Sequence, residues 1–253
     1  MINKTIHYCW FGKNKKPEIV KRCINSWKKK LPDYEIKEWN ESNFDIGYSK
    51  YTRQAYEAKK YAFVSDVARL KIIYEQGGVY LDTDVEIVKN LNPLLKNKAF
   101  FGIESNGKVN TGICFGAEAR NEIVKKMLDD YNNIEFCKNN SYDLTPCPIR
   151  NSKILTEKGF KLNNTIEKID DVTVYPSDYF NPKMSYGHAI ALTENTYSIH
   201  HYAGSWLSKQ QRQRSRILNN LKNTLGDKAG AIVYKTIFSP YVIISKIIEK
   251  IEK

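Results

Sequence analysis

Two aspartates directly after a short apolar strand are the residues in this chain best suited to chemistry. Residues 79–81, Val-Tyr-Leu, have the character of a strand, and Asp82-Thr83-Asp84 follows it. Side chains at positions i and i+2 of an extended segment point the same way, so Asp82 and Asp84 can converge on one point. Two like charges there repel each other unless a cation or a proton intervenes. A divalent ion such as Mg²⁺ or Mn²⁺ suits carboxylate oxygens and is commonly shared with substrate phosphates, so the pair predicts a metal–phosphate site.

The helix expected just before this strand carries a further pair of charges. Apolar residues between positions 63 and 74 recur with helical spacing, and Gly77-Gly78 permits the left-handed backbone that often ends a helix. Asp66 and Arg69 lie three residues apart and are therefore neighbours on one helix face. Taken alone, this spacing fits a surface ion pair as well as a functional pair. The stronger signal is the whole run S-D-x-x-R, G-G-x-Y and D-x-D.

That run resembles the core signature of the DXD-containing sugar transferases of glycosyltransferase family 32. This family includes bacterial capsular and lipopolysaccharide enzymes and the yeast-type initiating mannosyltransferases, and it is distantly similar to the catalytic domain of the large clostridial glucosylating toxins. The segments IHYCWFG, LPDYEIKEWNESNFD and HHYAGSW match the pattern in the same order, so the resemblance covers residues 2–207. It implies an α/β fold of the GT-A type, which is Rossmann-like and binds a nucleotide sugar, and a retaining, metal-dependent hexosyltransferase.

The resemblance also gives roles to the charged residues of the run. Asp84 is the expected direct ligand of Mn²⁺ or Mg²⁺, and Asp82 is expected to reach the metal through water or to contact the ribose. Asp66 is expected to hold sugar hydroxyls, and Arg69 the diphosphate or the sugar. Together with Asp82 and Asp84 they form the predicted catalytic group.

Residues near both ends of the matched region complete the predicted donor site. Trp10 closes the first strand, where an aromatic ring can stack on a nucleobase, and the resemblance implies uracil or guanine, with Tyr80 on the ribose or base side. Either ring could instead pack in the core. Ser205 and Trp206 follow Gly204 in a loop that can approach the diphosphate closely, although simple packing also explains Trp206.

A third metal ligand is expected at the end of a late strand. His200 and His201 stand there together, and neutral imidazole is an ordinary ligand for transition ions. Strand alternation points the two side chains to opposite faces, so one of them is expected to bind, and we favour His201. Asn110 and Thr111, before a buried strand, are placed on the acceptor or sugar side. No carboxylate stands out as a nucleophile, so the resemblance favours a front-face substitution in which the leaving phosphate helps to deprotonate the acceptor.

The composition and the pattern of apolar residues limit the architectures that the chain can adopt. At 253 residues, 42% of them hydrophobic, the chain is long enough for one medium domain with a real core. Five cysteines without a C-x-x-C pair argue against a disulfide framework or a zinc site and favour a reducing cytosol. No signal peptide or transmembrane helix is expected. Strands are expected at residues 5–11, 34–39, 79–81, 85–88, 100–103, 111–116, 172–175 and 197–201. One helix is expected to begin at Pro17, and two more are expected at residues 52–76 and 122–131. Residues 132–152 are expected to form a long loop.

The sequence predicts two domains: a catalytic GT-A domain at residues 1–207 and a basic, partly amphipathic helical extension at residues 208–253. The extension has ten Lys or Arg against three acids, part of a net charge of +12. No nucleic-acid-binding motif accompanies the charge, so no nucleic-acid partner is expected. After Pro240, isoleucines form one helical stripe opposite lysines, which fits a helix at an anionic membrane surface or a helix packed on the domain.

The sequence therefore predicts a metal-dependent glycosyltransferase of bacterial surface polysaccharide synthesis, capsular or lipopolysaccharide. The favoured donor is a UDP-sugar, with UDP-galactose or a UDP-N-acetylhexosamine first and GDP-mannose as the alternative. The expected acceptor is a glycan, plausibly polyprenyl-linked, which places the protein in the cytoplasm as a peripheral protein on the inner face of the cell membrane. A glycoside hydrolase is disfavoured because its two acids must stand at least ~5 Å apart, and Asp82 and Asp84, at positions i and i+2 of one strand, are too close for that. A basic membrane-binding module without catalysis is the alternative of another class.

Overall fold

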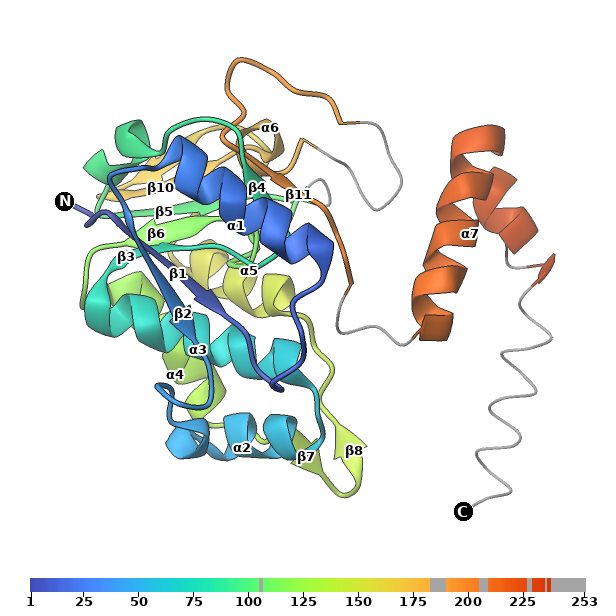
Figure 1. Ribbon diagram of the computed structural model, residues 1–253, viewed down its shortest axis with the longest axis horizontal. Helices are drawn as coiled ribbons and strands as arrows, with labels where there is room; N and C mark the ends of the chain where they lie inside the picture. The colour runs from blue at the N-terminus through green and yellow to red at the C-terminus, as the bar shows by residue number, and fades with distance from the viewer. Residues whose placement is uncertain (105–106, 183–189, 205–208, 227–228, 235, 238–253) are drawn as a thin grey trace. The chain divides into compact units, whose positions relative to one another are not determined.

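The computed structural model describes residues 1–253 except 105–106, 183–189, 205–208, 227–228, 235 and 238–253 (Figure 1). The chain forms two compact units, one of Met1–Met184 with Ile190–Trp206 and the other of Ser185–Ala189 with Leu207–Lys253. The predicted domain boundary between residues 207 and 208 falls in a stretch outside the described residues and stays a prediction.

A seven-stranded sheet is the centre of the larger unit, in the order β2-β1-β3-β6-β5-β10-β9 (Figure 1). Strands β1, β2, β3, β5 and β10 run the same way, whereas β6 and β9 are antiparallel to their neighbours. The strands are β1 Thr5–Cys9, β2 Glu35–Trp39, β3 Gly78–Tyr80, β5 Ala99–Gly102, β6 Phe115–Ala117, β9 Glu167–Ile169 and β10 Val172–Tyr175. The sheet is thus mostly parallel, and the predicted α/β fold is confirmed.

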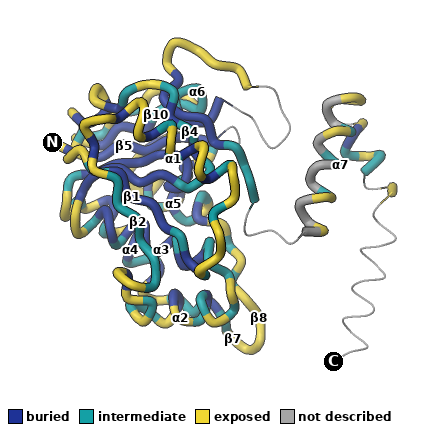
Figure 2. The backbone as a smooth tube through the Cα atoms, in the orientation of Figure 1, coloured by how far each residue is buried: buried dark blue, intermediate teal, exposed yellow. Residues whose placement is uncertain are grey.

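Helices cover both faces of this sheet, with α1 on one face and α3, α4 and α5 on the other (Figure 1). Neighbouring strand residues therefore enter different cores: Val79 packs with Trp27 of α1, and Tyr80 packs with Val64 of α3. Figure 2 shows strands β1, β5 and β10 as buried, whereas β2 at the edge of the sheet is partly exposed. The helices are α1 Glu18–Lys30, α2 Lys50–Glu57, α3 Tyr61–Gln76, α4 Glu122–Asn132, α5 Cys147–Glu157 and α6 Ser177–Phe180, with short 3₁₀ turns at Ile46–Tyr48 and Asn92–Lys96.

Two small sheets complete the larger unit. In one, β4 (Val85–Ile87) pairs antiparallel with β11 (Ser198–His200), which brings the late histidines beside the Asp-x-Asp segment. In the other, β7 (Cys137–Lys138) and β8 (Ser141–Tyr142) form a hairpin before α5.

The two glycines between α3 and β3 have different structural roles. Gly77 has a φ of 67°, and its N–H donates to the carbonyl of Ile73 at 2.9 Å, which ends the helix. Gly78 has a φ of 101°, and a Cβ there would lie 2.7 Å from the carbonyl oxygen of Thr5. The helix can therefore turn at once into a strand that lies close against β1.

Three expected elements differ from the structure. The single helix predicted over residues 52–76 is two helices, because the chain turns between them at Lys59, whose φ is 57°. The long loop predicted at 132–152 is wrong, since it holds the β7–β8 hairpin and the first turns of α5. The strand predicted at 111–116 begins only at Phe115.

The smaller unit contains α7, Lys209–Leu225, in the segment predicted as a helical extension. The apolar helix predicted after Pro240 lies outside the described residues. No helix in the described part of the chain is both long and apolar enough to cross a membrane.

Candidate active site

One edge of the main sheet collects nearly all the predicted site residues. Trp10 follows β1, Asn40 follows β2, Asp82 lies just beyond β3, and Glu104 lies just beyond β5. These four strands run the same way, so their carboxyl ends share an edge. Ligands of open α/β sheets bind outside such carboxyl ends.

Arg69 joins the helix and the strand of the predicted run. One guanidinium nitrogen, Nη2, lies 3.0 Å from Asp66 Oδ1 and 3.2 Å from Asp82 Oδ1. The guanidinium also lies over the ring of Tyr80, 4.9 Å from its centre, and Tyr80 donates its hydroxyl to Asp82 Oδ1 at 3.0 Å. The side chain of Arg69 is 4% exposed, so the surface ion pair considered from the sequence is instead a buried cluster.

Burial and mutual repulsion set the charges of the two carboxylates beside Arg69. Burial raises the pKa of Asp66 to about 6, although the guanidinium of Arg69 opposes the shift. The pKa of Asp82 is also raised by burial and by the charge of Asp84, against the effect of Arg69. Carboxylates with raised pKa values beside a buried arginine are typical of functional sites.

Because Gly112 has no side chain, it leaves room for the atoms of this cluster. A Cβ at this position would lie 2.2 Å from Asp82 Oδ2, 2.8 Å from Arg69 Nη1 and 3.0 Å from Asn110 Oδ1. Asn110 therefore belongs to the same cluster as the predicted catalytic residues. Its Oδ1 accepts hydrogen bonds from the N–H of Gly112 at 2.7 Å and from the thiol of Cys147 at 3.5 Å.

Asp84 faces His200 and not His201. Asp84 Oδ1 lies 3.4 Å from His200 Nε2, and Asp84 Oδ2 accepts the N–H of Ala203 at 2.7 Å. Burial opposes the charged form of Asp84, but His200 and this N–H outweigh it and lower the pKa to about 2. Burial likewise opposes protonation of His200, yet the contact with Asp84 raises its pKa.

His201 has a different partner. Its Nε2 lies 2.8 Å from Glu86 Oε2, and its backbone N–H donates to the carbonyl of Asp84 at 3.0 Å. The preference for His201 as a metal ligand has no support in this arrangement, because His200 is the histidine whose ring nitrogen reaches an aspartate of the Asp-x-Asp segment.

Asp84 and His200 fit a divalent metal as two protein ligands. Asp84 Oδ1 and His200 Nε2, which lie 3.4 Å apart, would both be able to reach one such ion. His200 Nδ1 is buried and has no hydrogen-bond partner among the described residues. No group of three or more metal-binding side chains occurs in the described part of the chain.

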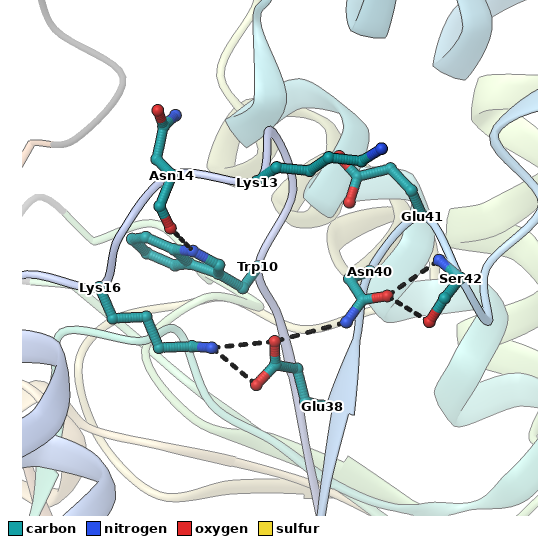
Figure 3. Close-up of a pocket in the computed structure, with 8 residues that line it drawn as sticks. All are labelled: Trp10, Lys13, Asn14, Lys16, Glu38, Asn40, Glu41 and Ser42. Carbon is teal, nitrogen blue, oxygen red and sulfur yellow. Dashed lines mark hydrogen bonds and ion pairs between the residues drawn. The ribbon is translucent and has the colours of Figure 1, made fainter.

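A pocket of about 410 Å³ opens beside Trp10 at the ends of β1 and β2 (Figure 3). The indole N–H donates to the carbonyl of Asn14 at 2.7 Å, and Lys16 Nζ lies 5.9 Å from the ring centre while it binds Glu38 at 2.8 Å. The pocket has the mixed aromatic and polar lining that a nucleoside needs. It is lined by Trp10, Lys13, Asn14, Lys16, Glu38, Asn40, Glu41 and Ser42.

Four predicted contact residues have other surroundings or lie outside the described part of the chain. Tyr80 is 1% exposed beneath Arg69 and bonds to Asp82, so it supports the aspartate and offers no face to a nucleoside. Thr111 is fully buried, and its hydroxyl accepts from Asn151 at 3.0 Å, so it does not line an acceptor site. Ser205 and Trp206 fall outside the described residues.

Two residues of the site are not among those predicted from the sequence. Glu104 directly follows the apolar residues at the end of β5, and its Oε1 accepts from Asn110 Nδ2 at 2.8 Å. The argument that identified Asp82, a carboxylate just beyond a buried strand, could have identified it. Cys147 lies at the start of α5 beside Arg69 Nη1, 3.9 Å away, and no sequence signal marks it.

Part of the chain is similar to known proteins. Residues 17–101 match the family described as "Glycosyltransferase sugar-binding region containing DXD motif". Inositol phosphoceramide mannosyltransferase 3 of Schizosaccharomyces pombe is 30% identical over 110 residues, which are 39% of this chain and 29% of that protein. The chain thus matches less than a third of the length of this relative.

Several solved glycosyltransferase structures resemble the chain. PaToxG glycosyltransferase has a TM-score of 0.49 at 22% identity, covering 62% of this chain and 70% of that one. GlyE of Streptococcus pneumoniae has a TM-score of 0.44 at 13% identity, covering 96% and 64%. The galactosyltransferase LgtC has a TM-score of 0.41 at 14% identity, covering 79% and 87%.

Proposed function

We propose that the protein transfers a sugar from a nucleotide sugar to a hydroxyl group of a glycan acceptor, as the match of residues 17–101 to the DXD-containing glycosyltransferase family suggests. The observation that carries the proposal is the cluster at the carboxyl end of β3. There Arg69, buried between Asp66 and Asp82, lies beside the Asp84–His200 pair. A buried cation and a candidate metal site at a sheet edge are what a sugar diphosphate requires.

Each group has a separate task in this reaction. Trp10 and its pocket hold the nucleoside, and Arg69 faces the diphosphate or the sugar. Asp84 and His200 would hold a divalent ion, Mn²⁺ or Mg²⁺, which stabilises negative charge on a leaving diphosphate when it is bound. Asp66 and Asn110 are placed to orient the hydroxyls of the transferred sugar. Asp66 is buried beside Arg69, and Asn110 is held by bonds to Glu104 and Gly112, which favours a site that is ordered before the substrate arrives.

The finer assignment follows the family resemblance. The reaction proceeds with retention through a front-face substitution, and the donor is a UDP-sugar, with UDP-galactose or a UDP-N-acetylhexosamine first. GDP-mannose is the alternative, and the mannosyltransferase among the relatives supports keeping it. The acceptor is a polyprenyl-linked intermediate of surface-polysaccharide synthesis.

A thermal-shift screen tests the donor directly. The full chain is heated with each UDP- and GDP-sugar, with and without Mn²⁺. A ligand that binds only the folded state raises the apparent melting temperature. We expect one nucleotide sugar to stabilise the protein and to be hydrolysed slowly, both only with the metal. No stabilisation and no hydrolysis across the whole panel would contradict the proposed function.

We also propose that the protein is peripheral on the inner face of the cell membrane. Helix α7 has five Lys or Arg and no acid in 17 residues. Ile217, Leu218, Leu221 and Leu225 recur at helical spacing along it. A basic helix with an apolar stripe suits an anionic lipid surface, where a lipid-linked acceptor would reside.

A further inference from the structure

We propose that Tyr202 is a positioning residue of the candidate metal site. Its ring fixes the imidazole of His200, and its backbone brings the N–H of Ala203 to Asp84. This role rests on the proposed function, because the divalent ion belongs to that function. Tyr202 lies outside the D-x-D run and is not among the residues predicted to contact the donor.

The imidazole of His200 lacks the hydrogen bond that usually orients a metal-binding histidine. Such a histidine donates its second ring N–H to a carboxylate, a carbonyl or water, which fixes the plane of the ring. His200 Nε2 lies 3.4 Å from Asp84 Oδ1, but Nδ1 is buried and has no hydrogen-bond partner among the described residues. Another contact must therefore hold the ring toward Asp84.

The ring of Tyr202 makes that contact. Its centre lies 4.2 Å from the centre of the His200 imidazole, and the two ring planes are inclined by 40°. Rings at this separation are in van der Waals contact. The imidazole therefore cannot turn about its Cβ–Cγ bond unless Tyr202 moves as well.

A buried asparagine holds Tyr202 in place. Asn181 is 2% exposed, and its Nδ2 donates to the hydroxyl of Tyr202. Asn181 directly follows α6, and the same helix anchors the start of β11, because the N–H of Tyr197 donates to the carbonyl of Tyr179 at 2.7 Å. The segment of α6 thus fixes β11 at its beginning and Tyr202 just after its end.

The backbone of Tyr202 is left-handed, with a φ of 51°. Residues other than glycine rarely adopt this conformation, which costs free energy and is most often found at functional sites. The preceding residue still follows the strand, since the N–H of His201 donates to the carbonyl of Asp84 at 3.0 Å. The turn at Tyr202 then brings the N–H of Ala203 to Oδ2 of the same aspartate, at 2.7 Å. One residue thus positions both candidate metal ligands.

Two substitutions separate the ring of Tyr202 from its backbone. Tyr202→Gly keeps the left-handed turn, because glycine adopts positive φ freely, but it removes the ring beside His200. Tyr202→Phe keeps the ring and loses the bond from Asn181. For the full chain, Mn²⁺ affinity is measured from the electron paramagnetic resonance signal of the free ion, with and without UDP or GDP. The temperature is chosen so that every variant is folded, and melting temperatures are measured separately without metal.

We expect Tyr202→Gly to weaken Mn²⁺ binding by about 10- to 100-fold, the usual effect of losing a group that orients a metal ligand. Tyr202→Phe should stay within about threefold of the wild-type Mn²⁺ affinity, because the ring contact with His200 remains. Its melting temperature should nevertheless fall, because the buried amide of Asn181 loses its acceptor. A role in stability alone would leave the Mn²⁺ affinity of both folded variants unchanged.

Lys59→Gly is the matched control, since Lys59 is exposed and has a φ of 57° in the turn between α2 and α3. It should keep the wild-type Mn²⁺ affinity. Unchanged affinity in Tyr202→Gly, or an equal loss in Tyr202→Gly and Tyr202→Phe, would overturn the positioning role and leave the glycosyltransferase proposal intact. If the wild-type protein bound no Mn²⁺ with or without nucleotide, the metal assignment in the proposed function would fail, and the role of Tyr202 with it.

Discussion

At the scale of single residues, the site is a set of charges that hold one another in place. Arg69 serves two aspartates with one nitrogen, and Asp84 depends on His200 and on the N–H of Ala203. Such groups act as a unit, so removing one partner leaves the others buried without compensation. Removal of one charge should therefore lower both stability and activity, whereas a small displacement that keeps every charge should lower mainly activity.

The variant Gly112→Ala tests how tightly the cluster is packed. Its new methyl group would enter the space of Asp82 Oδ2, Arg69 Nη1 and Asn110 Oδ1. These are ends of side chains and not backbone, so the fold can survive while the cluster is displaced. We expect hydrolysis of the donor to fall by about 100-fold, the usual cost of a misplacement near 1 Å, with the melting temperature nearly unchanged.

Gly47→Ala is the matched control for that variant. A Cβ at Gly47 would meet only Asp45 Oδ1, at 3.1 Å, and position 47 lies in a 3₁₀ turn away from the cluster. It should keep wild-type activity. Full activity of Gly112→Ala would show that the cluster tolerates displacement and so is not the reacting centre.

The variant Asp84→Asn removes the charge that a metal requires but keeps an oxygen for the N–H of Ala203. We expect metal-dependent donor hydrolysis to fall by at least about 100-fold, because a direct ligand matters at least as much as residues outside the coordination shell. Asp171→Asn, at an exposed residue paired with Lys98, controls for the lost charge. Mn²⁺-dependent hydrolysis within a few-fold of the wild type would contradict the assignment.

The sequence predicted residues with strong local signals and missed those defined by the tertiary fold. Asp82 and Asp84 follow a buried strand, and Asp66 and Arg69 share a helix face, so local periodicity was enough to group them. The choice between His200 and His201 depends on the pairing of β11 with β4, which one sequence does not reveal. The position of Tyr80 next to Asp82 suggested that its ring contacts the nucleoside. The structure shows instead that the guanidinium of Arg69 covers the ring.

At the scale of elements, the same distinction explains the wrong predictions. The β7–β8 hairpin lies in a stretch rich in polar residues, and long-range contacts order it. Gln54 of α2 bonds to both the N–H and the carbonyl of Cys137, at 3.0 and 3.1 Å. Arg150 of α5 bonds to Asp130 at 3.0 Å and also to Asp143. Gln54 and Cys137 are 83 residues apart, so no local pattern predicts the hairpin.

A buried histidine joins three elements and makes their packing sensitive to pH. His7 of β1 lies 3.0 Å from the carbonyl of Gly77 through Nε2, and Trp39 of β2 donates its indole N–H to Nδ1 at 3.0 Å. The neutral ring with its proton on Nε2 satisfies both contacts. A second proton on Nδ1 would face the indole N–H, so protonation breaks the link.

The stability of the fold should therefore fall in mild acid. Burial lowers the pKa of His7 to about 4, against an ordinary value of 6.5 in the unfolded chain. The unfolded state binds the extra proton first, so this contribution is full above pH 6.5 and is lost as the pH falls towards 4. Between neutral pH and about pH 5 we expect a loss of about 2 kcal/mol in the free energy of unfolding, measured by urea titration.

The variant His7→Gln isolates this effect. Glutamine does not titrate, so its unfolding free energy should start lower at neutral pH and decline less towards pH 5 than that of the wild type. Exposed carboxylates contribute the same slope to both proteins and cancel in the comparison. Parallel pH profiles for the two proteins would show that His7 is not the titrating group.

At the scale of the whole molecule, positive charge is concentrated away from the catalytic sequence. Residues 208–253 have ten basic and three acidic residues, and so supply +7 of the net +12. The catalytic cluster itself is rich in carboxylates. This separation fits a protein in which a basic segment attracts an anionic surface while the site binds a sugar nucleotide with the help of a cation.

Removing charge from α7 tests that division of tasks. In the full-length triple variant Arg212→Gln, Arg214→Gln and Arg216→Gln, we expect binding to phosphatidylglycerol-containing liposomes to weaken by about 100-fold, at about 1 kcal/mol for each basic residue near the surface. Donor hydrolysis in solution should not change. The control removes Lys28, Lys29 and Lys30, three exposed residues in the last turn of α1. Equal loss of binding in both variants would indicate a general effect of net charge and no surface-binding role for α7.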